Sequence, residues 1–138
     1  MPQTITLGVK QLVEDAKKEI TELPPAEVAT LRERRDVVIV DIRDIRELQR
    51  DGMIPGAFHC PRGMLEFWID PASPYFKPIF GEDKTFIFHC AADWRSALST
   101  QLAQRMGLKP VAHLKGGFNA WKAAGLPVEM PEGKHAKK

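Results

Sequence analysis

The chain contains few cysteines, with only Cys60 and Cys90 among its 138 residues. Two thiols are too few for the disulfide framework that small secreted domains use in place of a large core. We therefore expect both thiols to be free and the protein to be cytoplasmic. The chemistry of each cysteine has to be judged from its own surroundings.

Long apolar runs and a large charge excess are also missing. The first twenty residues, MPQTITLGVKQLVEDAKKEI, hold no apolar core of a signal peptide, and no segment approaches the length of a membrane span. The formal net charge of +2 is too small to favour nucleic acid, and part of it comes from the terminal GKHAKK. We therefore expect neither nucleic acid nor a membrane as a partner.

Strand and helix patterns alternate along the chain. Helices are predicted over residues 8–18, from Pro25 onward, and over residues 45–51, 95–107 and 118–125. The segments DVVIVDIRD and TFIFHC carry continuous apolar runs, which are typical of strands buried on both faces of a parallel sheet. The alternation predicts an α/β fold whose mainly parallel sheet has helices on both faces, with an extra helix at the N-terminus.

Cys90 stands where the predicted strand TFIFHC meets the next helix. Ligands of open α/β sheets bind outside the carboxyl ends of the strands. The backbone amides of Ala91 to Arg95 can curl into an anion-binding nest, and the positive end of the following helix points at the same place. These groups and the Arg95 guanidinium favour the reactive thiolate. We therefore predict that Cys90 is a nucleophile and not merely the last core residue of its strand.

Three segments, in order, resemble the rhodanese-like sulfurtransferases. HCAADWRS is similar to their active-site loop, in which a cysteine opens six residues that often end in arginine. VVIVDIRDIRELQRDGMIPGAFHCP and VAHLKGGFNAWKAAGLPV resemble the segments before and after that loop. The resemblance implies an open five-stranded sheet over residues 19–129. Residues 1–18 would then be a helical extension and residues 130–138 a flexible basic tail.

The resemblance also implies a reaction. Cys90 would take the outer sulfur of a donor such as thiosulfate as a persulfide and pass it to cyanide or a thiol. The substrate would be held by the loop that follows the cysteine, namely Ala91, Ala92, Asp93, Trp94, Arg95 and Ser96. No metal or organic cofactor is implied. The protein is expected to be a monomer or a homodimer, and a protein sulfur partner is compatible with the resemblance.

Two loop residues leave the identity of the substrate undetermined. Asp93 stands where the family often has glycine, and an acid there should weaken the binding of a dianion unless its side chain turns away. Trp94 could gate the pocket or pack on the outside of the loop. The spacing Cys-x4-Arg is one residue shorter than the Cys-x5-Arg loop of related phosphatases, which favours sulfur transfer over phosphate or arsenate chemistry. A relay or interaction module without turnover of small donors remains an alternative.

The other polar residues are expected to be structural. Asp41, at a strand end, should accept loop amides, with a secondary contribution to the active site left open, and Arg43 should pair with Glu47 at the surface. A disulfide between the two cysteines is disfavoured, because the family's strand order would place the Asp41 strand between them. His113 is expected to be a core or rim histidine with satisfied hydrogen bonds and not a catalytic base. The ligand spacings of a zinc site are absent.

Overall fold

The computed structural model describes residues 2–131. The basic tail predicted over residues 130–138 therefore lies outside the described residues from position 132 onward. Between residues 2 and 131, no helix is long and apolar enough to cross a membrane.

The structure is built on five parallel strands in the order β1-β5-β4-β2-β3. Their bounds are β1 Thr21–Leu23, β2 Val37–Asp41, β3 Phe58–His59, β4 Thr85–His89 and β5 Val111–Leu114. Asp41 is level with His89 of β4 on one side and with His59 of β3 on the other. The predicted five-stranded open sheet is confirmed, and polar residues end three adjacent strands at the same edge.

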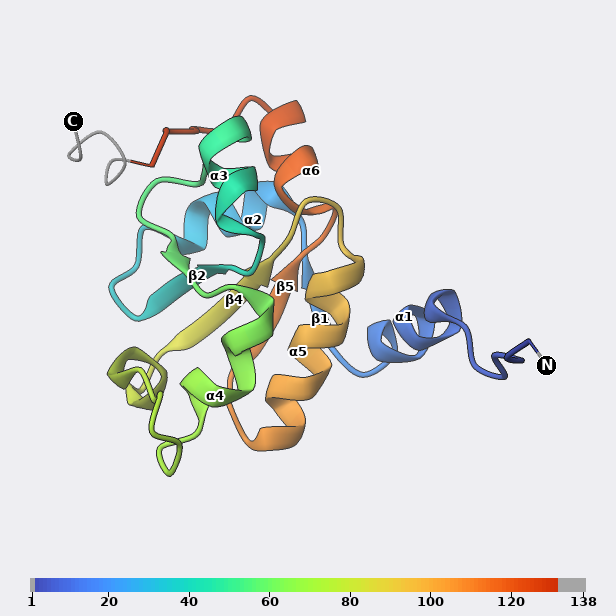
Figure 1. The fold of residues 1–138 in the computed structure, drawn as a ribbon. Helices are drawn as coiled ribbons and strands as arrows, with labels where there is room; N and C mark the ends of the chain where they lie inside the picture. The colour runs from blue at the N-terminus through green and yellow to red at the C-terminus, as the bar shows by residue number, and fades with distance from the viewer. Residues whose placement is uncertain (1, 132–138) are drawn as a thin grey trace.

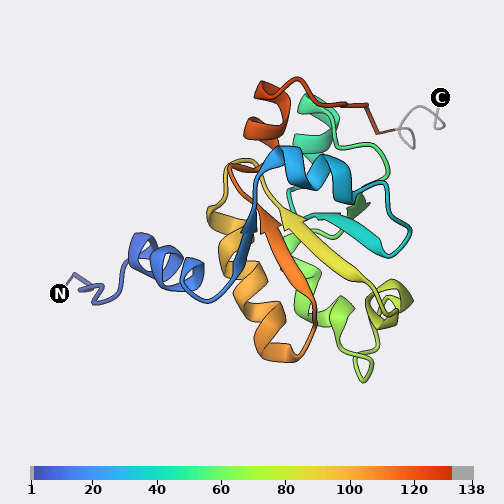
Figure 2. The ribbon, with the colours of Figure 1, turned by 180° about the vertical axis from the view of Figure 1, so that it is seen from behind.

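Helices cover both faces of the sheet, as predicted. They are α1 Val9–Lys17, α2 Pro25–Leu31, α3 Ile45–Asp51, α4 Leu65–Ile69, α5 Trp94–Met106 and α6 Gly117–Ala123, with short 3₁₀ turns η1 Arg62–Met64 and η2 Pro78–Gly81. Figure 1 and Figure 2 show α4 and α5 on one face and α2 on the other. The extra helix α1 lies beside α5 and projects from the body of the domain.

The continuous apolar runs of the central strands fill two cores. Successive side chains of a strand point to opposite faces. Phe86 and Phe88 of β4 therefore enter the core under α4 and α5, whereas Ile87 enters the core under α2 and α6. A strand buried on both faces has no room for polar residues until its end. The first ionisable groups consequently appear at the carboxyl edge, where the site is built.

The segment between β3 and β4 is rich in proline and aromatic residues and is packed by its own side chains. The Phe80 ring lies 5.4 Å from the Phe86 ring and 5.8 Å from the Phe58 ring, measured between centroids. Phe67 and Tyr75 form a second, exposed pair with centroids 6.4 Å apart. These contacts hold α4 against the sheet near the start of α5.

Candidate active site

Cys90 is the first residue after β4, and α5 begins four residues later at Trp94 with Asp93 as its N-cap. The residue is 1% exposed. Its sulfur accepts a hydrogen bond from the Ser96 amide at 3.4 Å and donates to the Ser96 hydroxyl at 3.6 Å. The thiol therefore lies beneath the loop, against the first turn of α5.

The loop is held open by the start of α6. The amides of Phe118 and Asn119 donate to the carbonyls of Cys90 and Ala91 at 2.8 and 2.9 Å. At Gly117, whose φ is +62°, an added Cβ would stand 2.0 Å from the Ala92 carbonyl oxygen. The carbonyls are thus turned toward α6. Within residues 2–131, no hydrogen-bond acceptor faces the amides of residues 91–95, which leaves these amides available to an anion.

Arg95, the last residue of the loop, is paired with Glu47 of α3. Its two terminal nitrogens donate to the two carboxylate oxygens at 2.8 and 3.0 Å. Glu47 is itself positioned by a capping box, because its carboxylate accepts the Asp44 amide at 3.0 Å. Glu47 and, more weakly, Cys90 raise the pKa of Arg95. The guanidinium therefore stays charged beside the sulfur.

The surface pair expected between Arg43 and Glu47 was wrong. Arg43 is 1% exposed and binds both carboxylate oxygens of Asp41, at 2.9 and 2.7 Å. It also donates to the Gly52 carbonyl at 2.8 Å, and its guanidinium lies 4.2 Å from the centre of the Phe118 ring. The strand turns its end inward, so the i,i+4 geometry of a helix surface does not apply. Glu47 is free to pair with Arg95.

Asp41 accepts the Arg43 amide at 3.1 Å, as expected for an acid at a strand end. Burial opposes its ionisation, but His89 and Arg43 outweigh that effect and lower the pKa of Asp41. Burial lowers the pKa of His89, whose Nε2 lies 3.5 Å from Asp41 and whose Nδ1 contacts the Cys90 carbonyl at 3.1 Å. Arg43 is therefore the lasting counter-ion of Asp41, and the His89 ring lies between Asp41 and the Cys90 carbonyl.

The Asp93 carboxylate does turn away from the loop, toward the extra helix. Lys17 of α1 lies 3.1 Å from it and 3.9 Å from the carboxylate of Glu22 on β1. The Asp93 side chain is 19% exposed, so this pair is only partly screened by water. Sequence reasoning missed Lys17, because no local pattern connects residue 17 with residue 93. Trp94, which follows, is 46% exposed.

Cys60 has the opposite environment. It is buried, and burial, with Glu66 adding to it, raises the pKa of its thiol to about 12. Strand β2 lies between β3, which precedes Cys60, and β4, which precedes Cys90. Both thiols are free, as predicted. Cys60 therefore behaves as an apolar core residue.

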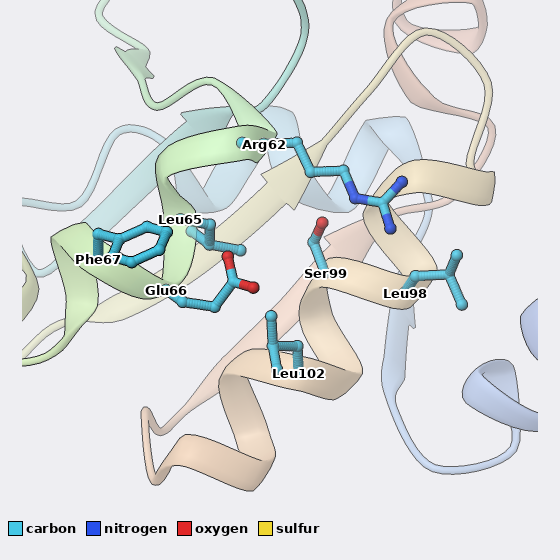
Figure 3. A pocket seen from close by; sticks show the side chains of 8 residues that line it. Arg62, Leu65, Glu66, Phe67, Leu98, Ser99 and Leu102 are labelled. Atoms are coloured by element: carbon cyan, nitrogen blue, oxygen red, sulfur yellow. The ribbon is translucent and has the colours of Figure 1, made fainter.

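A cavity of about 350 Å³ lies between α4 and α5. Figure 3 shows Arg62 and Glu66 reaching toward it from one side and Leu98, Ser99 and Leu102 from α5 on the other. Cys90 is not among its lining residues. The cavity is thus separate from the sulfur, although Ser99 lies one turn along α5 from Ser96.

The fold and the site together define a class: α/β proteins that carry a buried cysteine in the loop between a strand and a helix at the carboxyl edge of a parallel sheet. The sequence profile of the rhodanese-like domain family matches residues 24–124. A sulfurtransferase of Allochromatium vinosum is 31% identical over 75% of this chain and 88% of its own length. The chain belongs to the rhodanese-like domain family.

Two further relatives bear on the reaction. The thiosulfate sulfurtransferase GlpE of Glaesserella parasuis is 26% identical over 83% of this chain and 97% of its own length. A solved structure from Rhodopseudomonas palustris is 60% identical, with a TM-score of 0.90, and covers 94% of this chain and 99% of its own. That protein is described as one of unknown function and a possible tyrosine phosphatase.

Proposed function

We propose that the protein is a sulfurtransferase that carries sulfane sulfur as a persulfide on Cys90. The observation that carries the proposal is the loop itself. The start of α6 holds the loop carbonyls, and the amides of residues 91–95 donate no hydrogen bond within residues 2–131, so they are available to bind an anion next to Cys90. Together with the N-terminus of the 13-residue α5 and the Arg95 guanidinium, they favour negative charge at one point.

The reaction runs in two displacements. The Cys90 thiolate attacks the outer sulfur of thiosulfate, a sulfur–sulfur bond forms, and the bond to the donor breaks as sulfite leaves with its electron pair. An acceptor thiolate or cyanide then attacks the outer sulfur of the persulfide, and the Cys90 thiolate leaves. Neither step needs a metal or an organic cofactor. The loop residues Ala91, Ala92, Asp93, Trp94, Arg95 and Ser96 would hold the anion.

Thiosulfate is the proposed donor, and two observations support it. One is the similarity to a thiosulfate sulfurtransferase. The other is the pairing of Asp93 with Lys17 at 3.1 Å, which offsets the negative charge that would repel a dianion. Cyanide or a low-molecular-weight thiol is the proposed acceptor. The two free thiols agree with a reducing compartment, and we propose a cytoplasmic location on that basis.

The experiment is to incubate the protein with thiosulfate, mercaptopyruvate or glutathione persulfide and to measure its intact mass. We expect a gain of one sulfur atom, lost on adding cyanide and absent in Cys90→Ser. Cys60→Ser is the matched control, because it removes the other thiol and should still load. If the wild-type protein gains no sulfur from any of the three donors, the proposal is wrong.

A second candidate is a cysteine-dependent phosphatase, favoured by the description of the Rhodopseudomonas palustris neighbour. The loop argues against it, because Cys90 and Arg95 enclose four residues and a phosphate cradle needs a larger ring of amides. Turnover of an aryl phosphate that disappears in Cys90→Ser would favour this candidate. Sulfur loading without phosphate turnover would exclude it.

A non-enzymatic relay or interaction module is the third candidate. It would accept sulfur rapidly from a protein persulfide and only slowly from small donors. Comparing the loading rates for the two kinds of donor separates it from the proposed enzyme.

We also propose that the family domain extends over residues 19–129, with residues 1–18 as an extension whose helix α1 reaches the active-site loop through Lys17.

A further inference from the structure

A continuous hydrogen-bonded chain leads from the Cys90 sulfur to the rim of the sheet. The sulfur donates to the Ser96 hydroxyl at 3.6 Å, and that oxygen lies 2.7 Å from Nδ1 of His113 on β5. Nε2 of His113 lies 2.8 Å from the Glu22 carboxylate on β1. Ser96 and His113 are completely buried, whereas the Glu22 side chain is 27% exposed. The expectation of a satisfied, buried His113 is thus confirmed.

The direction of every hydrogen bond in this chain follows from its outer end. The Glu22 carboxylate can only accept, so Nε2 of His113 carries the proton. Nδ1 is then an acceptor, and the Ser96 hydroxyl donates to it. The Asp93 carbonyl is a weaker competitor for the same hydroxyl proton, at 3.4 Å. The lone pairs of Ser96 are therefore left to accept the Cys90 thiol proton.

We propose that Ser96, His113 and Glu22 form a proton relay that deprotonates Cys90 for sulfur transfer. The proposal rests on the proposed function, in which Cys90 must become a thiolate. Ser96 touches the reacting sulfur, whereas His113 and Glu22 act through it as positioning and proton-accepting residues. The hydrogen-bonding pattern is that of a nucleophile whose base is oriented by a third group.

The proton balance of the step is simple. As the Cys90 S–H bond breaks, its proton moves to the Ser96 oxygen and the Ser96 proton moves to Nδ1 of His113. The imidazolium that results is paired with the Glu22 carboxylate. When the acceptor later takes the outer sulfur, Cys90 leaves as a thiolate and the same proton returns along the chain. No oxidant or reductant is consumed.

Charged groups from three elements face this histidine. Glu22 of β1 contacts it directly, and Asp93 of the loop and Lys17 of α1 act at longer range. Burial lowers the pKa of His113, and Glu22 works in the opposite direction. A free imidazole is thus the resting form near neutral pH, as a proton acceptor requires. The Glu22 side chain is partly exposed, so the outer end of the relay is in contact with water.

The test uses three readouts on the full chain. The first is the rate of Cys90 alkylation by iodoacetamide, followed by mass from pH 5 to pH 9. The second is the rate of sulfur loading from thiosulfate over the same range. The third is the nitrogen NMR spectrum of the histidines, which reports the tautomer of His113. The variants are Ser96→Ala and Glu22→Gln, with Ser99→Ala and Glu19→Gln as matched controls.

We expect Ser96→Ala to slow alkylation and loading by about 100-fold at pH 7, the lower end of a general-base contribution. Glu22 raises the pKa of His113, so Glu22→Gln, which keeps the hydrogen bond and removes the charge, should weaken the base, lower both rates at pH 7 and move the acid limb of both pH profiles to lower pH. Ser99→Ala removes another buried hydroxyl of α5, which lacks a partner among residues 2–131, and should match the wild-type protein. The His113 spectrum should show the proton on Nε2.

Wild-type rates and pH profiles in both Ser96→Ala and Glu22→Gln would overturn the relay, as would a proton on Nδ1 of His113. These outcomes are distinct from failure of the proposed function. If the wild-type protein takes no sulfur from any donor, the alkylation profiles and the tautomer still decide whether the relay exists. Should Ser96→Ala unfold, the partly exposed Glu22→Gln carries the test.

Discussion

At the residue scale, the two cysteines show how surroundings decide reactivity. Both are buried, but among residues 2–131 Cys90 has the Ser96 amide and hydroxyl and the Arg95 guanidinium near its sulfur, whereas Cys60 has none of these. Cys60 has apolar neighbours and the carboxylate of Glu66, which with burial raise its pKa to about 12. Burial alone therefore does not identify a structural cysteine. The polar groups that face the sulfur distinguish a candidate reactive cysteine from a structural one.

The difference predicts selective labelling. At pH 8, a thiol with a pKa of about 12 is ionised to about one part in ten thousand, so Cys60 should resist iodoacetamide in the folded protein. Cys90 should react at least about 100-fold faster, and a bulky N-substituted iodoacetamide should react with it more slowly than iodoacetamide itself, because the residue is 1% exposed. Peptide mass mapping after a timed quench measures both rates. In urea the two cysteines should label equally; equal labelling of the folded protein would contradict the prediction.

At the element scale, four helices contact one loop. The start of α5 contacts the sulfur, the start of α6 holds the loop carbonyls, and α3 places Glu47 against Arg95. The extra helix α1 packs on α5 through Val13 and Ala16, which brings Lys17 to Asp93. Each element supplies one contact that the others cannot. The loop geometry is consequently a property of their arrangement.

The contact of α6 predicts that Gly117→Ala disables the loop. The new Cβ would meet the Ala92, Cys90 and Ala91 carbonyl oxygens at 2.0, 2.6 and 2.7 Å, and φ at this position is +62°. We expect sulfur loading to fall by at least about 100-fold and stability to fall by about 1–3 kcal/mol. Gly125→Ala is the control, since φ is also positive there but nothing lies within 4 Å. Equal activity of the two variants would show that the approach of α6 is not needed.

The contact of α1 predicts a charge effect on donor binding. Lys17→Met leaves the Asp93 charge uncompensated, so KM for thiosulfate should rise several-fold while kcat changes less. Asp93→Asn should lower KM, and the double variant should resemble Asp93→Asn, because the lysine has lost its partner. Steady-state kinetics at low ionic strength measure all three. If the KM of Lys17→Met equals the wild-type value, α1 does not contribute to donor binding.

For the whole molecule, a buried polar cluster lies at the centre of the sheet edge. Asp41 and Arg43 are 0% and 1% exposed, and His89 next to them is completely buried. Such a cluster stabilises only while all its members keep their partners. Because β2 and β4 are the central strands, the cluster connects the two cores. The stability of the entire fold is therefore sensitive to its charge state.

This sensitivity predicts a loss of stability on mild acidification. Burial lowers the pKa of His89 and His113 below the ordinary 6.5. Below pH 6.5 the unfolded chain therefore binds protons at these histidines that the folded chain does not bind. The contribution of each neutral histidine to the free energy of unfolding is fully present above pH 6.5. It is lost as the pH falls, by at most about 1.4 kcal/mol per pH unit for each histidine. Urea unfolding at pH 7.5, 6.0 and 5.0 measures the slope. His89→Gln should reduce it, and a flat profile from pH 7.5 to 5.0 would contradict the prediction.

The sequence by itself determined the architecture and the position of Cys90 at the end of a strand. Short continuous apolar runs rich in valine, isoleucine and phenylalanine indicate strands with both faces buried, and such strands in alternation with helices favour a parallel sheet. The same reasoning placed Cys90 at a strand end, and the number of residues from Cys90 to Arg95 gave the length of the loop. These features are local, because each depends on residues that are neighbours in the chain.

Only the tertiary structure decided what surrounds the sulfur. Glu47 pairs with Arg95 across 48 positions, Lys17 with Asp93 from the extra helix, and Glu22 with His113 across 91 positions. The expected pair of Arg43 with Glu47 failed because the buried end of β2 gives Arg43 to Asp41, two positions away, and folding brings Arg95 to Glu47 from 48 positions away. A charge pairs with the group that folding brings nearest in a low-dielectric environment, and a one-dimensional pattern does not encode that distance.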